Sequence, residues 1–176
     1  VLWVRGCRRG CPGCLSPESW SPEGPESSLD EVVDWVLACP GVQGLTLSGG
    51  EPMDQAPALA ALVDRVRARR DLGVVCYTGY RLEELVEVEH TALLRRVDLL
   101  IDGPYRVAEH GDFLWRGSAN QRLIAVTPRY RSHLPAPSQD RGAGLEFRLL
   151  ADGRFSFSGV PPWAGYREHL LGDGRR

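Results

Sequence analysis

The sequence is best interpreted from eight residues near its start, Cys7-Arg8-Arg9-Gly10-Cys11-Pro12-Gly13-Cys14, which follow the apolar run Val1 to Val4. The three cysteines are spaced C-x3-C-x2-C, and their thiolates can reach one inorganic centre if the backbone between them curls. Glycine accepts positive φ and proline fixes a bend, so the intervening residues favour such a curl. A closed iron–sulfur cluster or structural zinc site has four ligands. Three cysteines therefore predict a centre with one open position, where a small molecule can bind.

Spacing alone leaves other interpretations of the cluster open. A structural zinc site completed by a distant His or Cys, or a disulfide with a spare thiol, fits the same three residues. An odd count of five cysteines, three of them clustered, indicates metal or cluster chemistry in a reducing cytoplasm. Cys39 and Cys76 follow apolar residues, and we expect them to be buried small hydrophobic residues.

Length and composition indicate one globular domain with a substantial core. The chain has 176 residues, of which 43% are hydrophobic and 25% charged. A formal net charge of −2 argues against a general nucleic-acid binder. No apolar run approaches the roughly 20 residues of a membrane span, and no signal peptide is visible. We therefore expect a cytoplasmic protein with no nucleic-acid or membrane partner, although Val1 leaves the native start open.

Short apolar strands alternate with amphipathic helices along the first two thirds of the chain. Strands are expected at 1–5, 44–48, 72–77 and 97–101, and helices from the capping box Ser28–Glu31 to about 40, from about 54 to 70, and from 82 to 96. This alternation predicts an α/β fold, an incomplete, barrel-like parallel sheet with helical crossovers.

Polar or glycine-rich turns follow each of these strands. They are the cysteine loop, Gly49-Gly50-Glu51, Thr78-Gly79-Tyr80 and Asp102-Gly103. Because ligands gather at the carboxyl ends of parallel strands, we expect these turns to form one site. Each has a plainer interpretation as well: the glycine pair and Thr78 as ordinary turns, and Asp102 as a cap for the turn that follows it.

The pattern changes after Asp102. Residues 107–115 are expected to form a loop, 122–126 a strand, and 127–144 a long loop with three prolines. Alternating apolar residues at 145–150 and 154–158 flank Asp152-Gly153, which predicts a β-hairpin added to the sheet edge. We thus expect a domain over 1–126 and a loop-and-hairpin extension of the same domain over 127–176.

Five blocks of the sequence together resemble the radical S-adenosylmethionine enzymes, and more finely the small activating enzymes that serve anaerobic ribonucleotide reductase. The blocks are Gly6 to Cys14 with Ser19-Trp20, Leu47 to Pro52, Tyr77 to Tyr80, Asp98 to Gly103, and Trp115 to Gln121. The resemblance implies a [4Fe-4S] cluster on Cys7, Cys11 and Cys14, with S-adenosylmethionine at the open position. It also implies cofactor contacts by Gly49, Gly50, Glu51, Thr78 and Asp102. In this interpretation the glycines let the main chain approach the methionyl group, and Glu51 faces its ammonium.

The same resemblance implies an activity and partners. Reductive cleavage of S-adenosylmethionine would give a 5′-deoxyadenosyl radical, which abstracts hydrogen from a backbone glycine of a glycyl radical enzyme. An external electron donor such as flavodoxin or ferredoxin would reduce the cluster. Two alternatives stay open: a radical enzyme that modifies a peptide or small molecule, and a non-catalytic zinc- or cluster-binding module. Gly13 and Leu15 flank Cys14, whereas many radical S-adenosylmethionine enzymes have an aromatic residue there, so adenine packing must differ.

Overall fold

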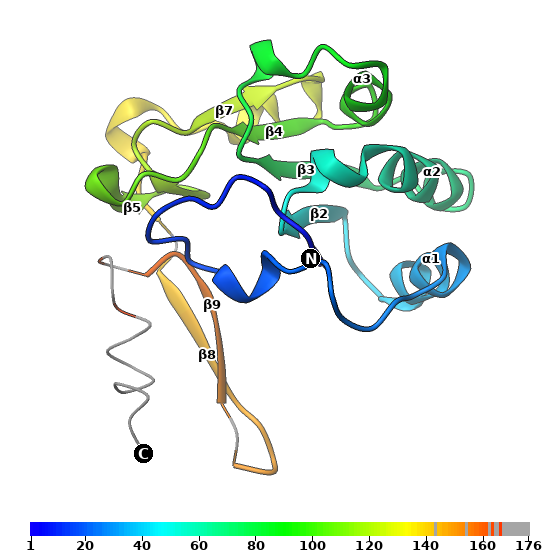
Figure 1. Ribbon diagram of the computed structural model, residues 1–176, viewed down its shortest axis with the longest axis horizontal. Helices are drawn as coiled ribbons and strands as arrows, with labels where there is room; N and C mark the ends of the chain where they lie inside the picture. The colour runs from blue at the N-terminus through cyan, green and yellow to red at the C-terminus, as the bar shows by residue number, and fades with distance from the viewer. Residues whose placement is uncertain (143, 154, 162, 164–165, 167–176) are drawn as a thin grey trace.

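A computed structural model describes residues 1–142, 144–153, 155–161, 163 and 166 of the chain. Its centre is a five-stranded sheet in the order β1-β2-β3-β4-β7 (Figure 1). The strands are β1 (Leu2–Val4), β2 (Gly44–Gly49), β3 (Gly73–Thr78), β4 (Leu99–Asp102) and β7 (Arg122–Ala125). The first four are parallel, which confirms the α/β prediction. The sheet is open, with β1 and β7 at its edges.

The fifth strand, β7, runs antiparallel to β4. Between the two strands the chain forms the hairpin β5 (His110–Phe113) and β6 (Arg116–Ser118), without a helical crossover. The loop predicted over 107–115 is wrong for residues 107–109, which form a 3-10 helix, and for residues 110–113, which form β5. Because this hairpin lies after the carboxyl end of β4, the chain re-enters the sheet from the same end and must run in the opposite direction.

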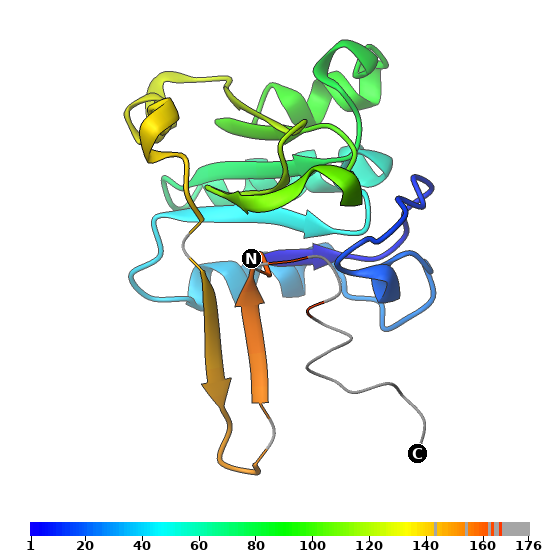
Figure 2. The same cartoon turned by 90° about the vertical axis from the view of Figure 1, so that its left-hand side faces the viewer.

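Three helices cover one face of the sheet: α1 (Leu29–Ala38), α2 (Ala56–Arg67) and α3 (Val88–Leu94) (Figure 2). The capping box predicted at Ser28 is present, since Ser28 Oγ accepts from the Glu31 N–H and the Glu31 carboxylate accepts from the Ser28 N–H. The helices pack on the apolar side of the strands, where Leu45, Leu47 and Leu100 belong to the buried core. No helix in the described part of the chain is long and apolar enough to cross a membrane.

Short 3-10 helices make up many of the connections. They are η1 (Pro17–Ser19), η2 (Pro52–Gln55), η3 (Leu82–Glu84), η4 (Val107–Glu109), η5 (Pro128–His133) and η6 (Pro137–Gln139). The helix expected over 82–96 is in fact η3 followed by α3. The helical path breaks at Leu85, whose side chain is buried in the core, and restarts after Glu87.

The C-terminal hairpin is confirmed as β8 (Leu145–Leu149) and β9 (Phe155–Gly159), joined through the Asp152-Gly153 turn. The expected addition to the sheet edge was wrong, because these two strands form a sheet of their own. Figure 2 shows them extending away from the five-stranded sheet. Arg154, expected in the second strand, and residues 167–176 of the expected extension lie outside the described residues.

Candidate functional site

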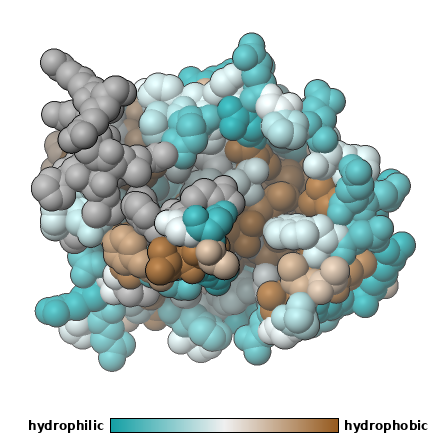
Figure 3. Space-filling model, turned by 90° about the horizontal axis from the view of Figure 1, so that it is seen from below, coloured by the Kyte–Doolittle hydropathy of each residue, from teal (hydrophilic) through white to brown (hydrophobic). Residues whose placement is uncertain are grey.

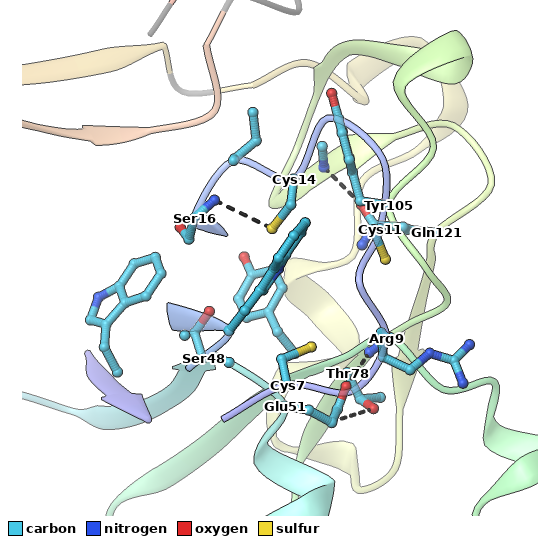
Figure 4. A pocket seen from close by; sticks show the side chains of 18 of the residues that line it. Cys7, Arg9, Cys11, Cys14, Ser16, Ser48, Glu51, Thr78, Tyr105 and Gln121 are labelled. Atoms are coloured by element: carbon cyan, nitrogen blue, oxygen red, sulfur yellow. Dashed lines mark hydrogen bonds between the residues drawn. The ribbon is translucent and has the colours of Figure 1, made fainter. Parts of the chain in front are cut away.

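A pocket of about 860 Å³ lies at the carboxyl ends of β1, β2 and β3 and extends over the sheet face that the helices leave open. Its lining includes Cys7, Cys11, Cys14, Gly49, Gly50, Glu51 and Thr78. Seven of the eight residues predicted for the site thus meet in one cavity (Figure 4). Its volume is within the range of pockets that hold ligands of cofactor size.

The cysteine loop is fixed at its base by backbone hydrogen bonds. The Gly6 N–H donates to Ser19 O at 2.9 Å, and the Cys7 N–H donates to Trp20 O at 3.0 Å. A tight turn then brings the Cys14 N–H to 3.1 Å from Cys11 O. These bonds hold the loop beyond the ends of β1 and β2.

The three thiols have different surroundings. Burial raises the pKa of the Cys11 thiol, and a hydrogen bond from the Tyr105 N–H offsets only part of this rise. The Ser16 N–H donates to Cys14 Sγ at 3.4 Å (Figure 4). All three cysteines are free, which counts against the disulfide interpretation. Among the described residues, no three His, Cys, Asp or Glu side chains are close enough together to hold a metal ion. The three sulfurs therefore line one pocket but do not converge on a single point. Chemically, three soft thiolate ligands are the donor set that suits an iron–sulfur cluster.

Close packing against the chain after β1 explains why residues 49 and 50 are both glycines, which the sequence alone did not reveal. The Gly50 N–H donates to Val4 O at 2.7 Å, and the Glu51 N–H donates to Gly6 O at 2.8 Å. A Cβ on Gly49 would lie 2.4 Å from Val4 O, and one on Gly50 would lie 2.3 Å from Gly6 O. Glycine is thus required for this segment to pack against the base of the cysteine loop, whatever the cofactor contacts are.

Glu51 is a buried carboxylate, with 1% of its surface exposed. Its Oε1 accepts from the Met53 N–H at 2.9 Å and from Thr78 Oγ1 at 2.8 Å, while Oε2 accepts from the Gly79 N–H at 2.7 Å. Burial raises the pKa of this carboxyl. Within the described part of the chain no ion pair reaches it. A carboxylate offers about four acceptor positions, so Glu51 can still accept one hydrogen bond from a cationic group in the pocket.

Thr78 and Asp102 are positioned differently from the sequence prediction. The Thr78 hydroxyl donates to Glu51 and accepts from the Tyr80 N–H at 3.1 Å, so it orders the turn after β3. Asp102 is fully buried and does not line the pocket. It accepts from the Leu82 N–H at 2.7 Å and from Arg122 Nε at 2.8 Å. The structure thus shows Asp102 as a cap, although for η3 rather than for the turn after its own strand.

Tyr105 is a pocket residue that the sequence reasoning did not single out. A Cβ on Gly13 would lie 3.7 Å from its ring, which therefore lies against the cysteine loop. Its hydroxyl is 2.9 Å from His110 Nδ1, and His110 Nε2 is 2.8 Å from Pro161 O. The only available signal was its place just after the strand that ends at Asp102. Tyr105 supplies an aromatic ring near the third cysteine, which Gly13 and Leu15 do not.

The block from Trp115 to Gln121 folds on itself beside the pocket. Gln121 Oε1 accepts from the Gly117 N–H at 2.9 Å and from the Ser118 N–H at 3.2 Å. Arg116 Nη1 donates to Gln121 O at 3.0 Å. Gly117 and Gln121 both line the pocket, so this block contributes to its wall.

Comparison with known proteins identifies the family. A family model described as a 4Fe-4S single cluster domain matches residues 1–124. A relative from Enterobacteria phage T4 is 34% identical over 139 residues, which cover 76% of this chain and 87% of the relative. One from Vibrio cholerae is 38% identical over 137 residues, covering 72% and 87%. Both are named anaerobic ribonucleoside-triphosphate reductase-activating protein. The chain belongs to this family of radical S-adenosylmethionine proteins.

A third activating protein, from Escherichia coli K12, is 33% identical over 135 residues, covering 69% of this chain and 84% of the relative. No solved structure matches the chain. The family model identifies residues 1–124 as a 4Fe-4S domain, and the three cysteines of the C-x3-C-x2-C motif in this range line the pocket.

Proposed function

We propose that the protein is a radical S-adenosylmethionine enzyme that activates a glycyl radical enzyme, an anaerobic ribonucleotide reductase, by abstracting hydrogen from a backbone glycine. One observation carries the proposal: the three cysteines line the same pocket as a buried carboxylate, Glu51, that has no ion-pair partner among the described residues. The names of the relatives support the class of partner. A bound [4Fe-4S] cluster would supply the electron that cleaves S-adenosylmethionine to methionine and a 5′-deoxyadenosyl radical.

The residues of the chain would have separate tasks. Cys7, Cys11 and Cys14 would hold the cluster. Glu51 would accept a charge-assisted hydrogen bond from the ammonium of S-adenosylmethionine. Gly49 and Gly50 hold that carboxylate and the cysteine loop close together, since any side chain there would force them apart. The apolar remainder of the pocket would limit access of water to the reacting atoms.

Anaerobic reconstitution with iron and sulfide tests the class of enzyme. We expect a brown [4Fe-4S] protein that forms 5′-deoxyadenosine from S-adenosylmethionine in the presence of dithionite. Cys11→Ala should lose both the cluster and the cleavage. Cys39→Ala is the matched control, because Cys39 lies at the C-cap of α1 and outside the pocket, and it should retain both. A colourless protein that holds one zinc ion would contradict the proposal, as would cleavage by Cys11→Ala.

The partner is tested separately. Incubation of the reduced enzyme and S-adenosylmethionine with an anaerobic ribonucleotide reductase should produce a glycyl radical signal in electron paramagnetic resonance. Flavodoxin or ferredoxin should replace dithionite as the electron donor. Cleavage of the cofactor without any radical on the reductase would leave the enzyme class intact and exclude this partner.

A further inference from the structure

Arg9 connects the cysteine loop to the turn that follows β3. Its stem passes over Gly79, where an added Cβ would lie 3.1 Å from Arg9 Cγ. Its guanidinium carbon lies 4.6 Å from the centre of the Tyr80 ring, and its Nη1 is 3.7 Å from Glu84 Oε1. Figure 4 shows the side chain leaving the loop on the side away from Cys7 and Cys14. One arginine thus makes three contacts with a segment some 70 residues away in the sequence.

The segment that Arg9 contacts is itself well fixed. The Gly79 N–H donates to Glu51, and the Tyr80 hydroxyl donates to Asp54 Oδ1 at 2.9 Å. Burial raises the pKa of Tyr80 to about 12, and the bond to Asp54 is the second largest cause. The side chain therefore stays a neutral phenol. A guanidinium over the face of a neutral tyrosine is attracted by the ring quadrupole. The turn is therefore a firm support for a cation from another element.

Arg9 occupies the part of the loop that lies between its two backbone anchors. The Gly6 and Cys7 N–H groups fix the beginning of the loop, and the bond from the Cys14 N–H to Cys11 O closes its end. Arg9 lies midway between Cys7 and Cys11, the widest interval of the motif. Both cysteines line the pocket, so the position of this span sets where their sulfurs lie in it.

We propose that Arg9 is a positioning residue, which locks the span between Cys7 and Cys11 onto the β3 turn through Tyr80, Gly79 and Glu84. The proposal rests on the proposed function for the role of the cysteines, but the lock belongs to the protein without any cluster. Arg8, its neighbour, is exposed and provides a matched control.

Hydrogen exchange of the cluster-free protein tests the lock itself. We expect amides of residues 7–11 to exchange roughly fivefold faster in Arg9→Ala, which is the effect of losing one such cation–π contact. Tyr80→Leu should have an effect in the same direction, and the double variant should be no worse than Arg9→Ala alone, because the Tyr80 ring acts on this span through Arg9. Tyr80→Phe keeps the ring and loses only the bond to Asp54, so it should lie much closer to the wild type than Tyr80→Leu does. Arg8→Ala should match the wild type. Additive effects of Arg9→Ala and Tyr80→Leu, or equal effects of Arg8→Ala and Arg9→Ala, would overturn the proposal.

Loss of the reconstituted cluster to a chelator under anaerobic conditions provides the second measurement. Arg9→Ala should lose iron roughly fivefold faster than the wild type and Arg8→Ala, and Arg9→Lys should lie between, because lysine keeps the charge without the planar stacking. If the wild type binds no cluster, the proposed function fails while the exchange result still stands. If the wild type binds a cluster and Arg9→Ala releases it at the wild-type rate, the lock is wrong and the proposed function is untouched.

Discussion

At the scale of single residues, Glu51 connects the three strand ends. It accepts hydrogen bonds from the chain after β2 and from the turn after β3, and its own N–H donates to the loop after β1. A buried carboxylate without a cation is costly, and this cost appears as a raised pKa. The carboxylate is therefore a binding site for a cation, and the ammonium of the proposed cofactor would be that cation.

The raised pKa of Glu51 predicts a pH dependence with a definite sign. A carboxyl whose folded-state pKa lies above its ordinary value near 4.5 binds its proton more tightly in the folded chain. Its favourable contribution is therefore complete below the unfolded-state pKa and is lost as pH rises through the folded-state pKa. We expect Glu51→Gln to be destabilised by about 1–3 kcal/mol at acid pH, with a gap to the wild type that narrows as pH rises.

Urea denaturation of the cluster-free proteins between about pH 4.5 and 8 measures this gap, and other titrating groups cancel in the difference between the two proteins. Binding of S-adenosylmethionine to the cluster-loaded wild type should respond with the opposite sign, since an ammonium needs the ionised carboxylate. A stability gap that widens with pH would contradict the account of Glu51.

Gly50 supports a second prediction at this scale. In Gly50→Ala the new Cβ would meet Gly6 O, Gly6 C and Ser19 O, all of them backbone atoms that cannot rotate away. We expect a loss of about 1–3 kcal/mol in the free energy of unfolding, as for other overpacked sites, together with poor cluster assembly. Gly10→Ala is the control: nothing lies within 4 Å of its Cβ position, so only its φ of +55° is strained. Equal retention of cluster by both variants would show that the contact of Gly50 with the loop base does not matter.

At the scale of elements, Asp102 joins β4, η3 and β7. Its carboxylate accepts from the Leu82 N–H at the start of η3 and pairs with Arg122 on β7. We expect Asp102→Asn to lower the free energy of unfolding by about 1.5–3 kcal/mol, because charge-assisted hydrogen bonds are lost in a buried setting. The affinity of the folded variant for S-adenosylmethionine should be unchanged. Equilibrium denaturation and a binding titration separate the two effects. Weaker binding without lost stability would contradict this account and support a direct contact of Asp102 with the cofactor.

Sequence periodicity was sufficient to predict the parallel strands and the helices α1 and α2, because each has an apolar stripe and α1 also has a capping box. It predicted α3 only as part of a longer helix, because the break at Leu85 leaves no clear signal in the sequence. It failed at residues 110–113, where His, Gly and Asp have low strand propensity and the pairing with Arg116 and Ser118 decides. It also could not reveal why Gly49 and Gly50 are glycines, since Val4 and Gly6 are distant in sequence. The role of Arg9 had no signal in the sequence, because its partners, Tyr80 and Glu84, lie in a distant segment of the chain.

At the scale of the whole molecule, the helices leave one face of the sheet open, and the pocket lies there. Large apolar residues are exposed around this side, among them Trp3 and, on the C-terminal hairpin, Phe147 and Leu149. Figure 3 shows hydrophobic side chains gathered on the face seen from below, beside a hollow. An exposed apolar surface next to a pocket is typical of a site that meets another macromolecule. It therefore supports a protein substrate in the proposed function.

The C-terminal hairpin joins the rest of the molecule at the pocket. Val160 and Pro161, which follow β9, line the cavity, and Pro161 O accepts a hydrogen bond from His110 Nε2. Because a carbonyl oxygen can only accept, Nε2 must carry the proton. In the neutral imidazole Nδ1 then accepts from the Tyr105 hydroxyl. We propose on this basis that residues 127–176 are an extension of the same domain.

The connection through His110 predicts how the hairpin responds to mutation. A hairpin of two strands is marginally stable without further packing, so its order depends on the few contacts at its base. In His110→Leu the amides of Gly159 and Val160 should exchange several-fold faster, while those of β2 and β3 keep their wild-type rates. Tyr105→Phe removes only the bond to Nδ1 and should have a smaller effect at the same amides, because Nε2 can still donate to Pro161 O. Unchanged exchange at Gly159 and Val160 in His110→Leu would mean that the hairpin is held to the pocket by other contacts. Faster exchange throughout the sheet would instead show that His110 stabilises the whole domain.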